Sequence, residues 1–318
     1  MTSQILSLKT KKDISKRQLT SIDYHKYYID RVLFEIAKMG RGRELAFLGY
    51  DQAIRHIKVH AIYYLKSNFQ AFNFYKHPFN IYYSLAHLEN VPMFSFVPPI
   101  RKRQQVVFNA NFKQYFRGVD LGLDFDECCI FCEGKHQCTK HDKLTNKSIC
   151  AKCPDYETNF HIMYEEVKRI KMSFSEWGLP YQLKFSGSGF HINIEYKYLK
   201  DCADIAQRIK RLSRDGSPTE VDEITLSKKL LNEFVAIFNL TTLDTSVVDI
   251  RRIWKCPYTI DIRTGNVALP LTDEQFRNFN YDMVRPENVI DTVRNRGLLE
   301  RPGDSKNLRN YFENFILG

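Results

Sequence analysis

The sequence predicts one large mixed α/β domain, and three observations support this fold class. Strand-like runs cover three segments, of which the first is mostly apolar: Gly118–Asp126, Tyr181–Phe185 and Ile192–Tyr196. Helical periodicity covers three others: Tyr24–Met39, Asn159–Trp177 and Ile224–Leu240. The chain of 318 residues is long enough to bury a full core. We expect a main domain over residues 1–285, a cysteine-rich insertion at about 127–155 and a C-terminal helical extension over 286–318.

The helices are predicted from apolar stripes and from glycines at their ends. Tyr24–Met39 stops at Gly40, and Asn159–Trp177 stops at Gly178. Glycine is the usual residue after the last helical turn because it adopts the left-handed conformation at no steric cost. In the second helix the apolar residues recur on one broad face, which therefore packs against the core: Phe160, Val167, Ile170, Phe174 and Trp177.

Two carboxylates lie two residues apart at the end of the strand Gly118–Asp126. Alternate residues of a strand share a face, so Asp124 and Asp126 point the same way. Paired carboxylates are costly to bury unless a positive group compensates, and hard divalent cations prefer oxygen ligands. The pair therefore predicts a Mg²⁺ or Mn²⁺ site. Asp120 has the same parity but lies roughly 13 Å from Asp124 along a strand, too far to join it.

A serine-glycine connection joins the strands Tyr181–Phe185 and Ile192–Tyr196. Gly187 and Gly189 permit a tight turn whose N–H groups point at one anion, and the hydroxyls of Ser186 and Ser188 add donors. His191 can donate to a phosphate oxygen whether it is neutral or charged. These features suit a triphosphate, although such a turn is weak evidence by itself.

A third acid and two arginines follow the predicted helix Ile224–Leu240. Asp244 would complete a two-metal site with the aspartate pair, and Asp249 is its rival for that place. Arg251 and Arg252 would hold phosphate through the fork geometry of the guanidinium group. Each motif taken singly also fits surface acids, an ordinary loop or a solvated charge cluster, but their joint order favours one site.

Six of the eight cysteines fall between the first and second motifs. In a chain without a signal peptide, disulfides are rare, and metal binding is the usual reason for such clustering. The spacing predicts a structural zinc site with these ligands: Cys129, Cys132, Cys150 and Cys153. Three further residues are alternates for the first pair: Cys128, Cys138 and His141.

Together these motifs resemble the archaeo-eukaryotic primase superfamily, which includes primase small catalytic subunits and primase-polymerases. The resemblance runs from about Arg43 to Leu271. It is carried by five segments: Arg43–Phe47 with Arg55, Leu123–Asp126, Ile149–Cys153, Phe185–Ile192, and Asp244–Pro257 followed by Thr264-Gly265. It implies a catalytic core with an antiparallel sheet of the RNA-recognition-motif type, flanked by helices, with an inserted zinc knuckle.

The resemblance also implies roles for single residues. Asp124, Asp126 and Asp244 would hold two Mg²⁺ or Mn²⁺ ions, and the incoming triphosphate would contact the remaining positions: Ser186, Ser188, His191, Arg251 and Arg252. The chain departs from the family where relatives often carry a histidine after Pro257. It has Asp261 there, so Arg263 is expected to contact the phosphate instead.

We therefore expect a template-dependent DNA primase or primase-polymerase that makes short primers on single-stranded DNA and releases pyrophosphate. Its substrates would be NTPs or dNTPs. One alternative is an end-joining or translesion polymerase of the same superfamily that only extends primers, because Ser188 stands where replicative primases often have two arginines. Another is a catalytically silent zinc-containing nucleic-acid-binding subunit.

The net charge of the chain fits a nucleic-acid partner. The formal net charge of +10 favours a polyanion, because lysine and arginine release counterions when they bind phosphates. A primase large subunit or another replication protein is a further candidate partner. We expect no membrane span and an intracellular protein, in the cytoplasm or nucleoid of a prokaryote, that is not secreted.

Overall fold

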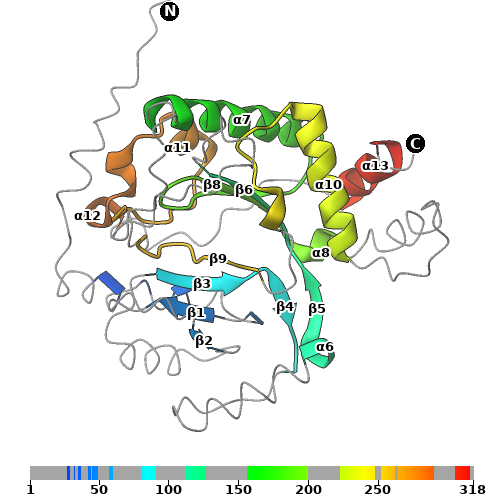
Figure 1. Cartoon of the computed structure of the whole chain (residues 1–318), viewed down its shortest axis with the longest axis horizontal. Helices are drawn as coiled ribbons and strands as arrows, with labels where there is room; N and C mark the ends of the chain where they lie inside the picture. Colours follow the sequence, from blue (N-terminus) through cyan, green and yellow to red (C-terminus); the bar gives the residue numbers. More distant parts are fainter. Residues whose placement is uncertain are drawn as a thin grey trace, which may run out of the picture.

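The structure of the protein is a computed structural model of the whole chain. The structure describes residues 27–28, 32, 35–36, 42–43, 45–48, 57–59, 80–90, 112–126, 156–199, 223–247, 252–261, 264–289 and 305–315. Within them the protein is a mixed α/β fold with three small antiparallel sheets (Figure 1). This confirms the mixed α/β class that the sequence predicts. The expected zinc insertion at about 127–155 lies outside the described residues.

The central sheet contains three strands in the order β6-β8-β7. These strands are β6 (Leu121–Phe125), β7 (Gln182–Phe185) and β8 (Phe190–Ile194). Both pairings are antiparallel, with Asp124 opposite His191 and Lys184 also opposite His191. One face carries the apolar residues, such as Leu123 and Ile192, and the other carries these polar side chains.

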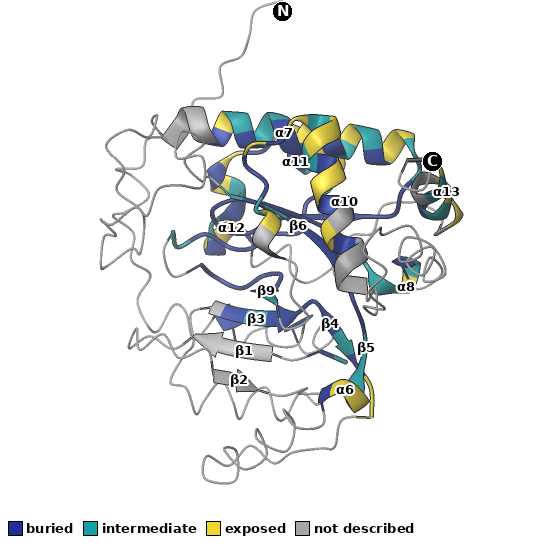
Figure 2. Ribbon diagram, turned by 45° about the vertical axis from the view of Figure 1, so that its right-hand side comes forward, coloured by how far each residue is buried: buried dark blue, intermediate teal, exposed yellow. Residues whose placement is uncertain are grey.

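Two long helices cover the apolar face of the central sheet (Figure 1). They are α7 (Tyr156–Glu176) and α10 (Glu223–Phe238), which confirm the helices predicted from the sequence. The stripe predicted on α7 is buried at Phe160, Val167, Ile170 and Phe174, and the solvent side of the helix is exposed (Figure 2). Gly178 ends the segment with φ +64°, as expected for a glycine after a helix.

A second sheet lies below the first in the order β2-β1-β3-β9 (Figure 1). Its strands are β1 (Leu45–Leu48), β2 (Ile57–Val59), β3 (Asn80–Ser84) and β9 (Ile253–Lys255). The edge strand β9 follows Arg252 directly. It therefore brings the arginine segment beside the polar face of the central sheet.

The third sheet corrects one sequence prediction. Its strands are β4 (Ala86–Leu88) and β5 (Phe116–Val119), and the short helix α6 (Phe112–Tyr115) leads into β5. The run Gly118–Asp126, predicted as one strand, is therefore divided between β5 and β6 at Asp120. The reason is physical: the Asp120 carboxylate is held by side chains of other segments, and its N–H donates to Leu85 O at 3.0 Å.

Short helical elements complete the described part. They are α8 (Tyr196–Leu199), the 3₁₀ turns η4 (Thr245–Val247) and η5 (Tyr281–Val284), α11 (Asp273–Arg277), α12 (Pro286–Val289) and α13 (Ser305–Phe315). Thr272 begins α11 with a capping box to Gln275. In α13, Leu308 is fully buried and Asn307 donates to Gly178 O at 3.2 Å, so the C-terminal extension closes part of the core.

The burial pattern near the N-terminus is consistent with the helix predicted there. In the segment predicted as the helix Tyr24–Met39, Tyr28, Val32 and Ile36 are all fully buried at four-residue spacing.

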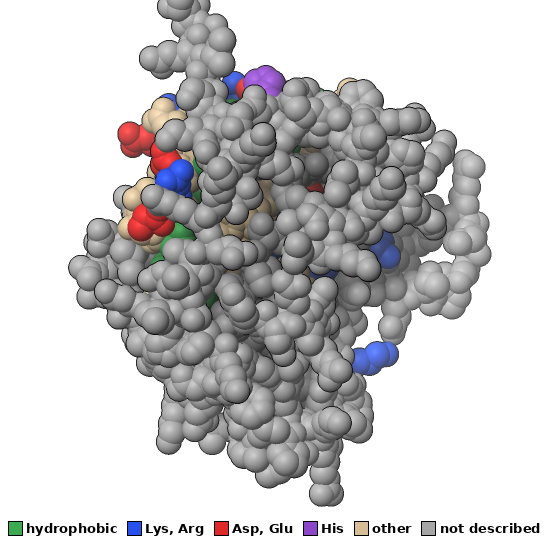
Figure 3. Space-filling model, turned by 60° about the vertical axis from the view of Figure 1, so that its left-hand side comes forward, with side chains coloured by type: hydrophobic (Ala, Val, Ile, Leu, Met, Phe, Trp, Pro, Cys, Tyr) green, Lys and Arg blue, Asp and Glu red, His purple; other side chains and the backbone are tan. Residues whose placement is uncertain are grey.

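None of the described helices is both long and apolar enough to cross a bilayer. On the face drawn in Figure 3, some of the described Lys and Arg side chains lie beside Asp and Glu at the upper left, and others lie apart from them on the right.

Candidate active site

Backbone pairing brings the three predicted acids to one place. An antiparallel bridge joins Phe125 to Leu243. On either side of it, Asp244 N–H donates to Asp124 O at 2.9 Å, and Asp126 N–H donates to Thr242 O at 3.1 Å. Asp124 and Asp244 are therefore opposite each other and share a face, where opposed Cβ atoms lie about 4.5–5.5 Å apart. Asp126 follows on the same face by strand alternation.

The acids belong to a polar row that crosses the central sheet. In register, Lys184 on β7 faces His191 on β8, His191 faces Asp124 on β6, and Asp124 faces Asp244. The imidazole Nε2 of His191 lies 3.1 Å from Asp124 Oδ1. Sequence analysis anticipated the acids and the histidine, and the register adds Lys184 to them.

Burial sets the protonation of the histidine–aspartate pair. Loss of solvent lowers the pKa of His191 to about 4, although the Asp124 charge opposes this shift. Burial by itself raises the pKa of Asp124, but His191, Arg252 and Lys255 outweigh it and lower that pKa overall. Near pH 7 the imidazole is therefore neutral and its Nε2–H donates to the carboxylate. The residue predicted to donate to a phosphate is thus engaged with the first acid.

Lys184 is a buried cation that sequence analysis missed. Its side chain reaches towards the second sheet, where Nζ donates to Lys255 O at 2.5 Å and lies 4.8 Å from the Tyr83 ring centre. Burial lowers its pKa to about 7. The signal available in the sequence was a lysine between Leu183 and Phe185 in the strand-like run Tyr181–Phe185.

Trp254 packs on the same histidine from β9. Its ring centre lies 4.2 Å from that of His191. The indole fills the space over Gly122, where a Cβ atom would collide with its ring carbons. Within the described part of the chain, Trp254 Nε1 and His191 Nδ1 are buried and lack a hydrogen-bond partner. The Trp254–His191 contact thus connects β9, which follows Arg252, to the polar row of the central sheet.

The serine-glycine connection forms the predicted tight turn. Ser186 N–H donates to Gly189 O at 2.7 Å, and Gly189 N–H donates to Ser186 Oγ at 3.1 Å. Gly187 has φ +100°, a conformation that favours glycine. A Cβ on Gly189 would collide with Phe125 O, so the turn lies against the end of β6. The turn is therefore beside the acids, with Ser186 and Ser188 both buried.

The segment after β9 is packed against this turn. Gly187 O accepts hydrogen bonds from Thr264 Oγ1 at 2.8 Å and from Asn266 Nδ2 at 3.3 Å. Asp261 is fully buried beside Gly187, with its Cβ 2.6 Å from where a Cβ on Gly187 would stand. Lys255 Nζ donates to Asp261 Oδ2 at 2.6 Å and balances its charge. The position at which the sequence resemblance leads us to expect a histidine thus holds a carboxylate paired with Lys255.

The remaining predicted ligands are placed only in part. Arg252 Nη2 lies 3.4 Å from Asp244 Oδ2, with both side chains partly exposed. Arg251, Arg263 and the rival acid Asp249 lie outside the described residues. So do all the cysteines and the histidine predicted to bind zinc: Cys128, Cys129, Cys132, Cys138, His141, Cys150 and Cys153.

The three acids have the right ligand chemistry for a divalent ion, but their side chains are not arranged around a common point. Three carboxylates supply the hard oxygen ligands that Mg²⁺ and Mn²⁺ prefer. Among the residues that the structure describes, however, no three His, Cys, Asp or Glu side chains are grouped closely enough to hold a metal ion. Asp124 contacts His191 and Asp244 contacts Arg252. A divalent ion would compete with these two partners.

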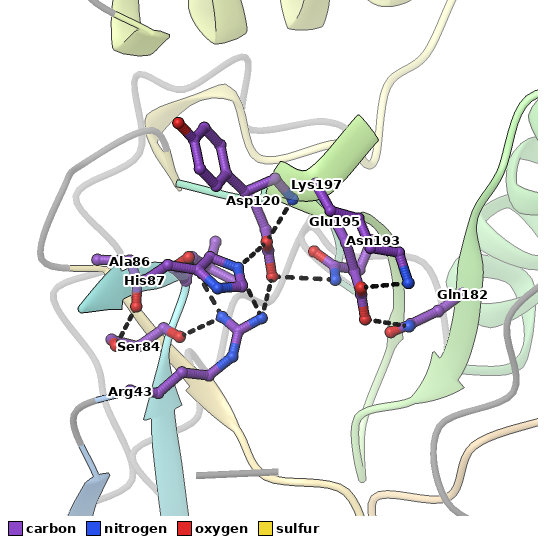
Figure 4. A network of polar contacts seen from close by, with 11 residues as sticks. Arg43, Ser84, Ala86, His87, Asp120, Gln182, Asn193, Glu195 and Lys197 are labelled. Atoms are coloured by element: carbon purple, nitrogen blue, oxygen red, sulfur yellow. Dashed lines mark hydrogen bonds and ion pairs between the residues drawn. The ribbon is translucent and has the colours of Figure 1, made fainter. Parts of the chain in front are cut away.

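Asp120, which the sequence excluded from the metal site, has a different role (Figure 4). Its carboxylate accepts from Arg43 Nη2 at 2.7 Å, from Asn193 Nδ2 at 3.2 Å and from the Tyr196 N–H at 2.8 Å, and it contacts His87 Nε2 at 2.5 Å. Burial raises its pKa, but Arg43 and His87 outweigh burial and hold the pKa well below the usual range. Asp120 is therefore a structural ion-pair residue.

Comparison with known proteins gives likenesses among solved structures. No family model matches the chain, and no curated protein matches it. Among solved structures, the chain is similar to the polymerase domain of Mycobacterium tuberculosis ligase D in complex with DNA. The TM-score is 0.44 and the identity is 10%, over 86% of this chain and 88% of that domain.

Proposed function

We propose that the protein is a nucleotidyltransferase that synthesises short primers on single-stranded DNA from nucleoside triphosphates. The observation that carries this proposal is the pairing of β6 with the segment before η4, which puts Asp124 opposite Asp244 and Asp126 beside them. Three carboxylates on one face, next to a glycine turn, suit metal-assisted phosphoryl transfer. The sequence resemblance to primases gives the proposal its reaction.

The three acids would hold Mg²⁺ or Mn²⁺, which supplies charge neutralisation at the attacked phosphate and the leaving pyrophosphate. The Asp124 carboxylate would bind the ion once its hydrogen bond from the Nε2–H of His191 is broken. That N–H then becomes available as a donor to a phosphate oxygen. Arg252, partly exposed beside Asp244, presents its guanidinium to the same substrate. Arg251 and Arg263 remain predicted triphosphate ligands.

The turn Ser186–Gly189 contributes its position and its shape. Its internal hydrogen bonds and the contacts of Gly187 O to Thr264 and Asn266 fix it at the end of β6. A turn fixed before the substrate arrives costs little ordering on binding. Ser186 and Ser188 are proposed to contact the triphosphate from this turn.

The proposed template and cofactors follow from charge and composition. The net charge of +10 supports a nucleic-acid template, since lysine and arginine bind phosphates. A structural Zn²⁺ held by Cys129, Cys132, Cys150 and Cys153 remains part of the proposal. A primase large subunit is a proposed partner.

Primer-free synthesis on single-stranded DNA tests the proposal. Reactions with labelled NTPs or dNTPs and Mg²⁺ or Mn²⁺ are run with the wild type, Asp124→Ala and Asp244→Asn. Lys168→Ala, on the exposed face of α7, serves as the surface control. We expect primers from the wild type and the control only, while all four proteins keep the same circular dichroism spectrum. Normal synthesis by Asp124→Ala would overturn the assignment of the acids.

The same reactions discriminate the second candidate, a polymerase that extends primers without starting them. Ser188 favours it, because replicative primases often have two arginines in this loop. Extension of an annealed primer without any primer-free product would establish this candidate. Failure of both reactions, together with retained DNA binding, would indicate a binding subunit.

A further inference from the structure

Glu166 on α7 makes four hydrogen bonds to the turn that follows α10. Its Oε1 accepts from the N–H and the hydroxyl of Thr241 at 2.8 and 2.6 Å. Its Oε2 accepts from the N–H and the hydroxyl of Thr242 at 2.9 and 2.5 Å. Glu166 is only 2% exposed. All four hydrogen bonds have an ionised carboxylate as acceptor, and such bonds are stronger than those between neutral groups.

The turn that Glu166 holds is the one that pairs with the metal-binding strand. Thr242 O accepts the Asp126 N–H, Leu243 bridges Phe125, and Asp244 N–H donates to Asp124 O. Asp244 lies two residues from the Glu166 contact at Thr242. The position of the third acid relative to the first two is therefore set by three backbone contacts and by the carboxylate behind them.

From this geometry we infer that Glu166 is a positioning residue, which fixes Thr241 and Thr242 so that Asp244 reaches the divalent ion together with Asp124 and Asp126. The inference rests on the proposed function, because it takes Asp244 as a metal ligand. It goes beyond it by assigning a role to a buried acid that touches neither the metal nor the substrate. Carboxylates are frequent in such supporting positions around metal ligands.

The rival explanation is that Glu166 only fastens α7 to the turn after α10. In that case its loss lowers stability and leaves the site of the folded protein unchanged. The two explanations differ in the metal affinity of the folded protein, which a purely structural tie does not alter. A measurement of metal binding without nucleotide separates them.

The chain supplies a matched control at the preceding residue. Glu165 lies on the same helix, and its partly exposed side chain pairs with Lys168 at 3.3 Å. Glu166→Gln replaces one acceptor oxygen by an amide that cannot accept from Thr241 or Thr242, whereas Glu165→Gln removes the same charge and alters no contact to the turn. Any effect of the lost charge alone appears in both variants.

The experiment is a Mn²⁺ titration at about 15 °C, near the usual temperature of maximum stability. The electron paramagnetic resonance signal reports the concentration of free Mn²⁺. We expect the Kd for Mn²⁺ to rise about 10- to 100-fold in Glu166→Gln, as for other residues that support metal ligands. We expect no change in Glu165→Gln. Primer synthesis by Glu166→Gln should recover at high Mn²⁺ concentration.

Two outcomes would contradict the inference: equal Mn²⁺ affinity in the two glutamine variants, or lost synthesis in Glu166→Gln that excess Mn²⁺ does not restore. Failure of the proposed function has a different signature: the wild type itself would then make no primers, or Asp244→Asn would bind Mn²⁺ as tightly as the wild type does. Circular dichroism and thermal melts of each variant confirm that folded protein is compared.

Discussion

The Asp120 carboxylate offers the sharpest test of the fold, through the substitution Asp120→Asn. The change keeps the size of the side chain but removes the charge that balances Arg43, whose side chain is 9% exposed. Removing one partner of a buried ion pair costs about 3–5 kcal/mol, because the other charge stays buried without compensation. Contacts to His87, Asn193 and the Tyr196 N–H are perturbed at the same time.

The expected change in melting temperature follows from chain length. With an unfolding entropy of about 2.1 cal/mol/K per residue, 318 residues give about 1.5 °C per kcal/mol, so Tm should fall by about 4–8 °C. Asp282→Asn is the control, because its partner Arg285 lies 2.9 Å away at the surface and such pairs contribute about 0–1 kcal/mol. Urea titrations and thermal melts give both values. A loss below about 1 kcal/mol in Asp120→Asn would refute the reasoning.

The same residue predicts a dependence on pH. The folded pKa of Asp120 is depressed, so its contribution is present above the unfolded value of about 3.9 and is lost as the pH falls below it. The unfolding free energy of the wild type should therefore fall more steeply below about pH 5 than that of Asp120→Asn. In Arg43→Met/Asp120→Asn, the loss should be smaller than the sum of the single losses.

Three further predictions concern the polar face of the central sheet. Gly122→Ala should cost about 1–3 kcal/mol in urea unfolding, because the new Cβ displaces the Trp254 ring; a cost equal in a Trp254→Leu background would contradict this cause. For Lys184, the folded pKa of about 7 lies below the unfolded value, so the wild type should gain unfolding free energy relative to Lys184→Met between about pH 7 and 10. Parallel pH profiles would argue against a buried charge. Gly187→Ala should lower stability by about 1–3 kcal/mol, since φ +100° strains any other residue and the Asp261 Cβ occupies the space; Asp261→Gly, which removes that Cβ, should relieve only the second part.

Local patterns in the sequence predicted the parts of the fold that depend on local physics. Strand alternation placed Asp124 and Asp126 on one face, and the apolar stripe and terminal Gly178 defined α7. The break at Asp120 was not predictable in this way, because the apolar run continues through it. Its cause is a set of partners from Arg43 to Tyr196 that only tertiary structure assembles.

The candidate site shows the same division. The serine-glycine turn and the acids were predicted, whereas Glu166 and Lys184 were missed. Glu166 belongs to an amphipathic helix, where a glutamate is expected to face solvent, and nothing local indicates that Thr241 and Thr242 lie behind it. The pairing of Asp124 with His191 depends on register between β6 and β8, which the sequence does not specify.

One carboxylate joins all three sheets. Arg43 lies just before β1 in the second sheet, His87 is on β4 in the third, and Asn193 is on β8 in the central sheet, yet all contact Asp120 (Figure 4). A change at any one of these positions alters the partner that the other three require. In homologous sequences these four positions should therefore covary as a group, and their residue types should separate lineages more sharply than those of the apolar core.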